Sequence, residues 1–241
     1  MLEVHLLTLF PEAVEGYLRA SILGRAQATA KVQVHVLDFR KFTTDKHRSV
    51  DDRPYGGGPG MVLKPEPIFA AVEEVESRFG PCHRILLTPS GEPFRQSHAQ
   101  EFSRHRRLLL LCGRYEGFDE RIRQGLEWTE ISLGDFVLSG GEIPALAVID
   151  ATVRLLPGVL GDEASAVHES FCADPHLLDH PHYTRPPEFR GMTVPEVLLS
   201  GDHGAVARWR RGQAESRTRD RRPDLYQRRL AEPSADETRN P

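Results

Sequence analysis

The sequence predicts an α/β domain with a parallel sheet, followed by a small helical unit toward the C-terminus. Strand-like and helix-like hydrophobic patterns alternate through roughly the first 155 residues, which is typical of parallel sheets built from βαβ units. From Gly158 to about Pro187 the composition changes to Gly, Asp, His and Pro, which indicates a linker. We therefore expect an α/β domain over residues 1–157, a linker over 158–187 and a helical domain over 188–241.

The elements are expected in the following order along the chain. Residues 4–10 form an apolar run that stops at Pro11, typical of a buried strand, and residues 12–27 repeat Val14, Leu18 and Ile22 at helical spacing. The pattern then predicts strands over 32–37, 84–88, 108–112 and 130–133, and helices over 67–78, 96–104, 118–125 and 142–155. Residues 40–64 show no period and contain many glycines, so we expect a long loop there. In the C-terminal part, residues 194–200 and 205–213 are the better helical segments, and the tail after Pro233 is polar.

Composition excludes several classes of protein. The 241 residues are 39% apolar and 27% charged, which allows a buried core, and no window approaches the ~18 uninterrupted apolar residues of a membrane span. Three widely spaced cysteines without a C-x-x-C pair argue against a disulfide framework and a thiolate zinc site. The N-terminal residues lack a basic stretch before an apolar run, so no secretory signal is evident. We expect a cytoplasmic protein with no membrane partner.

Charge is distributed unevenly along the chain. Residues 1–200 have a formal charge of −7, whereas residues 201–241 have +3, and all ten basic residues of that segment are arginine. Only four of the 31 basic residues in the chain are lysine, so arginine use is general and any single arginine is explained by composition. The net charge of −4 alone predicts no polyanionic partner, but the clustered arginines suit contacts with phosphate groups.

Three glycine-rich turns follow expected strands. They cover residues 88–91, 112–117 and 133–142, and two of them combine glycine with Asp, Glu, Arg or Tyr. Ligands of parallel α/β sheets collect at loops beyond the carboxyl ends of the strands, where glycine lets the backbone approach a ligand closely. Each turn alone is explained by ordinary turn chemistry, but the three together favour a shared pocket. The fingerprints of Rossmann dinucleotide sites, P-loops, zincins and α/β-hydrolases are absent.

A fourth loop, residues 47–61, places charged residues beside a run of glycines. It is either a flexible surface linker or a loop that becomes ordered on a partner. For the second interpretation its arginines would contact phosphate groups, and the candidate nucleic-acid-binding residues are Arg48, Asp51 and Arg53.

Several long motifs occur in a fixed order from the first strand to about Pro223: RSVDDRPYGGGPGM, LCGRYEGFDER, SLGDFVLSGGEIPA, PGVLGDEAS, HYTRP and VPEVLLSGDH. In these motifs the sequence resembles the bacterial tRNA (guanine-N1)-methyltransferases of the TrmD family, which belong to the SPOUT superfamily. The resemblance implies a deep trefoil knot in the α/β domain, a homodimer, and S-adenosylmethionine as methyl donor. It also implies methylation of guanine N1 at position 37 of tRNA, beside the anticodon, with tRNA and not DNA as the partner.

The same resemblance assigns the cofactor site by motif. The residues expected to bind S-adenosylmethionine are Leu87, Thr88, Pro89, Gly91, Gly113, Tyr115, Glu116, Gly117, Leu133, Gly134, Asp135, Phe136, Val137, Leu138, Gly140 and Gly141. The family is also linked to Mg²⁺, for which Glu116 and Asp135 could supply oxygen ligands, but no metal-binding set is assigned.

Two catalytic residues follow from the resemblance. Arg154 matches the arginine that stabilises charge on guanine O6, and Glu169 occupies the position of the aspartate that removes the N1 proton. The substitution of Glu for Asp adds one methylene, and the neighbouring His168 is the alternative base. Because Glu169 lies far along the chain from the cofactor loops, we expect an active site shared between two subunits.

The resemblance also gives the arginine-rich C-terminal segment a role. The residues expected to contact tRNA phosphates are Arg208, Arg210, Arg211, Arg217, Arg219, Arg221 and Arg222. Two alternatives to the methyltransferase are a catalytically silent RNA-binding relative and a SPOUT enzyme that acts on another RNA. The retained glycine loops argue against the first, and the RPYGGGPGM loop together with the C-terminal domain argues against the second.

Overall fold

The computed structural model describes residues 1–161 and 169–232. The chain divides into two compact units, residues 1–161 and 162–241, which we describe separately. In the described part, no helix has both the length and the apolar character needed to cross a lipid bilayer.

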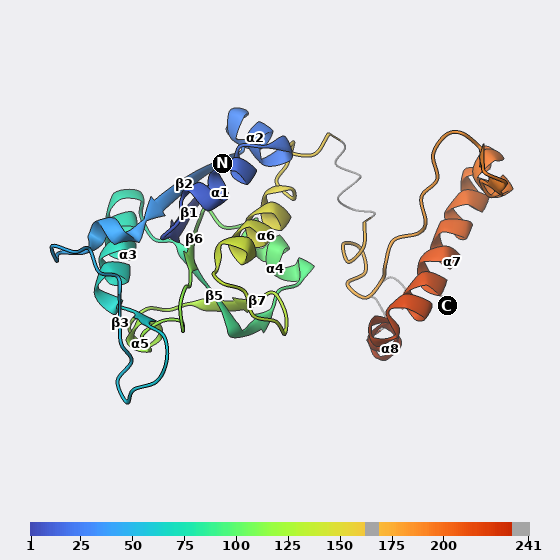
Figure 1. The fold of residues 1–241 in the computed structure, drawn as a ribbon. Coiled ribbons are helices and arrows are strands. Elements are labelled where there is room, and N and C mark those ends of the chain that lie inside the picture. The colour runs from blue at the N-terminus through green and yellow to red at the C-terminus, as the bar shows by residue number, and fades with distance from the viewer. Residues whose placement is uncertain (162–168, 233–241) are drawn as a thin grey trace. The chain divides into compact units, whose positions relative to one another are not determined.

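The first unit is built on a five-stranded, fully parallel sheet (Figure 1). Its strands are β1 (Leu2–Thr8), β2 (Val32–Asp38), β5 (His83–Pro93), β6 (Arg107–Cys112) and β7 (Thr129–Ser132), in the order β2-β1-β6-β5-β7. The register of β5 on β7 shifts between Leu87 and Glu92, so the second half of β5 bends away from the first. Because all five strands run the same way, their carboxyl ends lie along one edge of the sheet.

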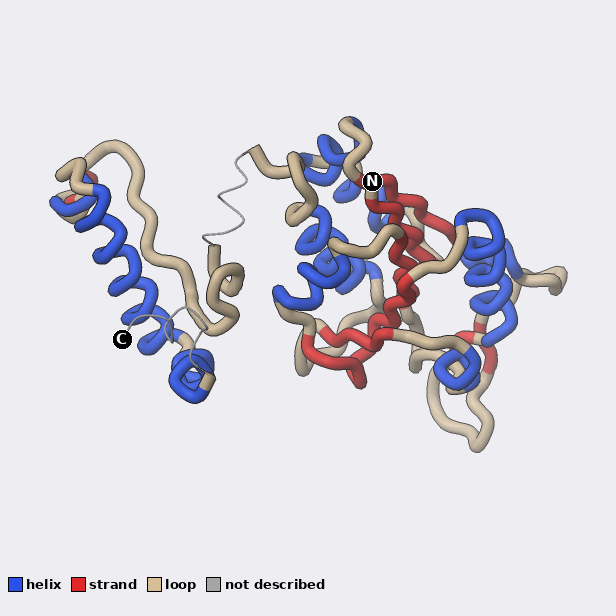
Figure 2. The backbone as a smooth tube through the Cα atoms, turned by 180° about the vertical axis from the view of Figure 1, so that it is seen from behind, coloured by secondary structure: helices blue, strands red, loops and turns tan. Residues whose placement is uncertain are grey.

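Helices cover both faces of this sheet (Figure 2). One face packs against α1 (Glu12–Leu18), α2 (Ser21–Ala28), α4 (Gln96–Phe102) and α6 (Glu142–Val153). The other packs against the 3-10 helix η1 (Phe39–Phe42), α3 (Pro65–Phe79) and α5 (Arg121–Gly125). The central strand β6 shows why the sheet is buried on both sides: Leu108 and Leu110 join the first core cluster, and Leu109 and Leu111 join the second. The expected α/β fold with a parallel sheet is confirmed.

The expected helix over residues 12–27 is wrong, because the chain breaks it into α1 and α2. Ala20 is extended, with φ −94° and ψ 158°, and Ser21 has a positive φ of 47°. Gly24 then lies so close to the carbonyl of Arg19 that a Cβ atom would collide with it. Hydrophobic spacing continues through the break because both helices bury their apolar residues against the same face of the sheet.

The expectation that residues 40–64 form a long loop is also wrong in part. Two short strands, β3 (Asp51–Asp52) and β4 (Val62–Leu63), pair antiparallel, and Val50 and Leu63 beside them are fully buried. These two apolar residues anchor the loop in the second core cluster, while Tyr55 at its tip is fully exposed.

The second unit contains a short antiparallel pair, β8 (Glu188–Phe189) and β9 (Met192–Thr193), then η3 (Glu196–Leu199) and two helices, α7 (His203–Arg221) and α8 (Pro223–Ala231). The Asp202 side chain caps α7 by accepting from the amide of Ala205 at 2.9 Å. The helix is longer than the expected 205–213, since the alanine, glutamate and arginine residues that follow are good helix formers.

Candidate active site

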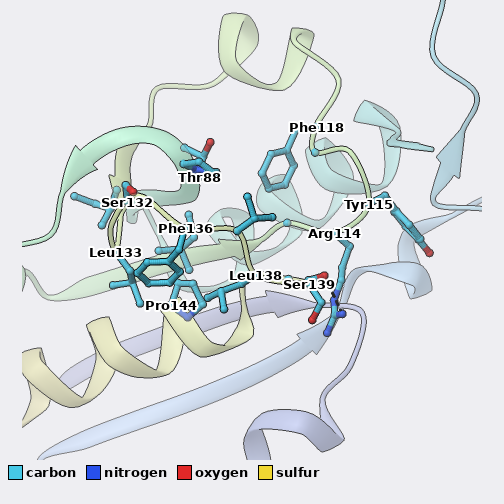
Figure 3. A pocket seen from close by; sticks show the side chains of 18 of the residues that line it. Thr88, Arg114, Tyr115, Phe118, Ser132, Leu133, Phe136, Leu138, Ser139 and Pro144 are labelled. Carbon is cyan, nitrogen blue, oxygen red and sulfur yellow. Dashed lines mark hydrogen bonds between the residues drawn. The ribbon is translucent and has the colours of Figure 1, made fainter. Parts of the chain in front are cut away.

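A cavity of about 340 Å³ opens at the bend of β5, where the expected turn over 88–91 lies within the strand, and at the carboxyl ends of β6 and β7 (Figure 3). It lies within the size range of small-molecule sites, and its walls come from the three glycine-rich turns. Fourteen of the sixteen residues expected to bind the cofactor line it: Leu87, Thr88, Pro89, Gly113, Tyr115, Glu116, Gly117, Leu133, Gly134, Phe136, Val137, Leu138, Gly140 and Gly141. Gly91 and Asp135 are not among its lining residues.

Gly91 has a structural position instead. It lies in the bent half of β5, where a Cβ atom would collide with the backbone of Glu130 and Ile131. Asp135 is exposed to solvent beside the cavity. Of the two carboxylates named for Mg²⁺, Glu116 lines the cavity and Asp135 does not.

Backbone contacts join two of the loops at the floor of the cavity. The amide of Gly141 donates to the carbonyl of Gly113 at 2.9 Å, and Arg114 forms a β-bridge with Gly140. A Cβ atom on Gly141 would lie 2.7 Å from the Cα atom of Cys112, which leaves no room for any other residue. The close approach forms a cradle of main-chain atoms that can hydrogen-bond to the polar edges of a small ligand.

A buried polar network supports this cradle, and its members are missing from the residues expected at the site. Glu142, the first residue of α6, is 4% exposed and accepts from the hydroxyl of Thr8 at 2.7 Å. Arg114 forms an ion pair with the other carboxylate oxygen of Glu142 at 3.0 Å and donates to the carbonyl of Ser139 at 3.1 Å. Figure 3 shows the Arg114 side chain extending past Ser139. The network ties the loop after β6 to the start of α6 and to β1.

Other lining residues also lie outside the expected set: Phe118, Arg123, Ile131, Ser132, Ser139 and Pro144. Four of them lie inside the quoted motifs, and Arg123 and Ile131 lie within two residues of a motif, so they would have been found by taking every residue of each motif with a short margin. Arg123 donates to the hydroxyl of Thr88 at 3.2 Å and pairs with Glu130 at 3.1 Å. These contacts hold the turn within β5 beside the other two.

The loop over residues 50–63 lies against the turn after β6. Leu63 donates its amide to the carbonyl of Gly117 at 2.9 Å, and Glu116 donates its amide to the carbonyl of Met61 at 3.0 Å. The turn needs left-handed backbone, with φ 59° at Tyr115 and 113° at Gly117. Arg48 and Arg53 of the charged loop are exposed, whereas Asp51 is half-buried in β3.

Cys112 lies beneath the cavity and is fully buried. Burial, and to a smaller extent the charge of Glu142, raises the pKa of the Cys112 thiol well above its usual range. The thiol is therefore neutral at physiological pH and is excluded as a nucleophile for this site.

The two expected catalytic residues lie away from this cavity along the chain. Arg154 is the C-cap of α6, twelve residues after Glu142, and the rise of an α-helix places it about 18 Å from the end that touches the cavity. Glu169 lies in the second unit, half-buried near Cys172. His168, the alternative base, lies outside the described residues.

The expected RNA-binding arginines lie on or next to α7. All seven are exposed: Arg208, Arg210, Arg211, Arg217, Arg219, Arg221 and Arg222. Arg219 pairs with Asp220 at 2.9 Å, and Arg222 pairs with Asp224 at 2.7 Å. The segment therefore presents a basic surface in which some of the charges already have acidic neighbours.

Comparison with known proteins places these features in a family. A family model described as tRNA (Guanine-1)-methyltransferase TrmD matches residues 2–228. A tRNA (guanine-N(1)-)-methyltransferase of Anaeromyxobacter sp. (strain K) is 54% identical, over 98% of this chain and 94% of its own length. Proteins of the same name from Synechococcus sp. (strain JA-2-3B'a(2-13)) and Bacillus subtilis (strain 168) are 59% and 52% identical. Both matches cover 93% of this chain. They cover 88% of the length of the Synechococcus protein and 92% of the length of the Bacillus subtilis protein.

The motifs that suggested a resemblance lie inside the matched region, from the loop at residues 47–61 to the start of α7. The match extends over both units of the chain and so includes the three cavity loops and the arginine-rich helix. Because the family model and these relatives each cover nearly the whole sequence, the chain belongs to the TrmD family of tRNA (guanine-1)-methyltransferases.

Proposed function

We propose that the protein transfers a methyl group from S-adenosylmethionine to N1 of guanine 37 in tRNA, in the cytoplasm and as a homodimer. The observation that carries the proposal is the cavity formed by three glycine-rich turns at the bend of β5 and the carboxyl ends of β6 and β7. Family membership supports methylation of tRNA guanine N1, and the cavity supports a methyl donor held by main-chain groups.

The bound donor would supply an electrophilic methyl group on a sulfonium. Around it, the turn after β7 provides an apolar rim through Phe136, Val137 and Leu138, while the backbone of residues 113–117 supplies hydrogen-bonding groups. Gly113 and Gly141 let the two loops approach each other closely enough to form the floor. These residues would orient the donor and keep it in one conformation before the guanine arrives.

We infer that the α/β domain is knotted. Strand β6 lies between β1 and β5, and the segment after β7 returns to the end of β6, where Gly141 touches Cys112. From there α6 continues under α1 and α4. This return of the chain beside an earlier loop supports the trefoil knot that the SPOUT resemblance implies.

The chemistry requires a base and a cation at the guanine. N1 carries a proton at neutral pH, and its removal places negative charge on O6. Glu169 would accept the proton, and the guanidinium of Arg154 would stabilise the charge on O6 as it develops. A Mg²⁺ ion at this site would have Glu116 as its carboxylate ligand from the cavity wall.

A second copy of the chain would complete the site. Within one chain, Arg154 lies about 18 Å along α6 from the cavity, farther than an arginine side chain reaches. The rim of the cavity is also strongly exposed, with Val137 at 89% and Phe136 at 55%, which is unusual for large apolar side chains. A partner that covers this rim and brings its own Arg154 to the donor would account for both observations.

A product assay tests the function. Purified protein is incubated with methyl-labelled S-adenosylmethionine and two tRNA transcripts that differ only in guanine or adenine at position 37. We expect 1-methylguanosine in the first transcript and no label in the second. Label at another position, or tRNA binding without any transfer, would contradict the proposal.

Arg154→Ala tests the assigned role within the same assay. We expect a loss of roughly 10²–10³ in the methylation rate, since its charge is needed mainly in the transition state. Affinity for S-adenosylmethionine in calorimetry should stay within about twofold of the parent. Arg19→Ala, an exposed arginine of the same unit paired with Glu15, is the matched control and should leave both values unchanged.

A further inference from the structure

Two histidines and a glutamate converge at the edge of the sheet opposite the cavity. His83 is the first residue of β5, Glu101 lies in α4, and His105 follows α4 in the turn that leads to β6. One ligand atom from each side chain lies within 4.8 Å of the other two. The rings of His83 and His105 stack, with centroids 4.2 Å apart and 22° between their planes.

Both imidazoles are half-buried. A neutral imidazole carries a free lone pair, which is the form that binds a metal ion.

Thr129, at the start of β7, adds a contact outside the cluster. Its hydroxyl lies 3.1 Å from Nε2 of His83. Metal-binding histidines usually have such a partner on the ring nitrogen that does not bind the ion, because it fixes the ring orientation and the tautomer. The second nitrogen, Nδ1, then retains the lone pair.

We propose that His83, Glu101 and His105 form a binding site for a divalent transition-metal ion of the zinc class. Two imidazole nitrogens and one carboxylate oxygen are a ligand set that zinc accepts, whereas Mg²⁺ prefers oxygen ligands alone. Ligands that share one zinc ion lie about 3.4 Å apart, given metal–ligand distances of roughly 2.1 Å. The exposed side chain of Glu101 can turn to close the remaining gap, and water would complete the coordination.

A second group, Asp179, His180 and His182, is less suited to a metal ion. Its carboxylate already contacts Nε2 of both histidines, at 2.8 Å for His182 and 3.7 Å for His180. A metal ion there would have to replace these contacts. Within the described part of the chain, no ion pair or side-chain hydrogen bond engages the Glu101 carboxylate. It is therefore available to bind a metal ion.

The proposed metal site is separate from the methyl-transfer site. His83 precedes Leu87 by four residues on β5, about 13 Å at the rise of a β-strand. An ion bound to it would link β5, α4 and the turn before β6. It would stabilise the half of the sheet that carries the cavity without touching the donor.

Titration of the full, tag-free protein with zinc, after treatment with a chelator, tests the site. We expect one ion per chain by calorimetry and a tetrahedral visible spectrum with cobalt. His83→Asn and His105→Ala should each weaken zinc binding by about a hundredfold, and Thr129→Val by about tenfold. The double variant His180→Ala, His182→Ala is the matched control and should bind zinc like the parent.

Three results would overturn the proposal. They are the absence of stoichiometric zinc binding, equal zinc affinity in the His105→Ala variant and the parent, and loss of binding in the His180/His182 control. Thermal denaturation followed by circular dichroism checks that each variant is folded, and His105→Ala remains informative if the buried His83→Asn variant is unstable. Removal of zinc with Mg²⁺ kept in excess in the buffer should leave methyl transfer unchanged at moderate temperature, so the metal site and the proposed function can fail independently.

Discussion

At the scale of single residues, variants of Glu169, the proposed base, show how strongly the methylation rate depends on the length of that side chain. Glutamate and aspartate have similar intrinsic acidity, so the extra methylene changes position rather than basicity. We expect Glu169→Gln to lose about a hundredfold or more in single-turnover rate, because an amide cannot accept the N1 proton. Glu169→Asp should keep substantial activity. If Glu169→Gln is nearly as fast as the parent and His168→Ala is inactive, the imidazole is the base.

We expect low pH to destabilise the first unit through protonation of the buried His5 side chain. It is fully buried on β1, stacks on His35 of β2 at 4.9 Å, and neither of its ring nitrogens has a hydrogen-bond partner. Burial, followed by the charge of His35, lowers the pKa of His5 to about 4, while Glu3 raises it and Arg107 lowers it by smaller amounts.

The sign of the pH dependence follows from this lowered pKa. The unfolded chain binds a proton near pH 6.5 and the folded chain only near pH 4, so stability is complete above pH 6.5 and declines as the pH falls toward 4. The loss from this group is at most about 3 kcal/mol. His5→Phe should flatten that decline in urea unfolding measured from pH 7.5 to 4.5. His47→Gln, an exposed control, should leave it unchanged, and equal slopes for His5→Phe and the parent would contradict the assignment.

At the scale of elements, α7 presents its arginines in two stripes. Arg210, Arg217 and Arg221 recur at intervals of seven and four residues and so share one side of the helix. In the described part of the chain, no ion pair engages these three side chains. Arg211, Arg219 and Arg222 lie on a second stripe, where Glu215, Asp220 and Asp224 lie within 3.5 Å of them.

The two stripes give a matched pair of variants for tRNA binding. Replacing Arg210, Arg217 and Arg221 by glutamine should reduce the slope of log affinity against log salt by about three units, one for each lost phosphate contact. The same change at Arg211, Arg219 and Arg222 should reduce it by about one unit or less, because those guanidinium groups already have acidic neighbours. Equal reductions in the two variants, or none, would show that the first stripe is not the tRNA-binding side.

Elements that depend on local pattern could be predicted from the sequence, and those that depend on distant contacts could not. The apolar run of β6 and the apolar helix α6 lie within one or two residues of their expected bounds. The break between α1 and α2 was missed because it arises from the close approach of Gly24 to Arg19, which leaves hydrophobic spacing intact. The anchoring of the charged loop was missed because two isolated residues, Val50 and Leu63, make it.

The same distinction holds for the site. Its three loops could be predicted because each is a glycine-rich turn after an expected strand, and their convergence follows from a parallel sheet. The Arg114–Glu142–Thr8 network could not, since its members are separated by 28 and 134 residues and each reads as an ordinary polar residue. The expected helix over 142–155 already places Arg154 at the far end of the helix that begins at the cavity, and α6 agrees.

At the scale of the whole molecule, the separation of Arg154 from the cavity predicts complementation between chains. Thr88→Trp is expected to fill the cavity from its rim and abolish donor binding, which calorimetry can verify. Mixed with Arg154→Ala, it should restore roughly a quarter of the parent activity, because half of the dimers are mixed and each has one intact site. Neither variant alone should be active.

Further pairings identify the chain that supplies Glu169. If Glu169 also reaches the cavity of the partner, Thr88→Trp with Glu169→Ala should recover activity, and Arg154→Ala with Glu169→Ala should not. Recovery in the last pair would show that the two residues serve one site from different chains. If Thr88→Trp mixed with Arg154→Ala recovers no activity, although native mass spectrometry detects mixed dimers, then Arg154 acts on the cavity of its own chain.

The main-chain floor of the cavity has a consequence for inhibition. Gly113 and Gly141 bring backbone groups together where no side chain fits, so substitution there disrupts the fold before it alters the shape of the site. An inhibitor that depends on side chains at the rim, such as Val137 or Leu138, can be defeated by a single codon change at an exposed position. A compound that hydrogen-bonds only to the backbone of residues 113–117 and 140–141 leaves few substitutions that would weaken its binding and still preserve the enzyme.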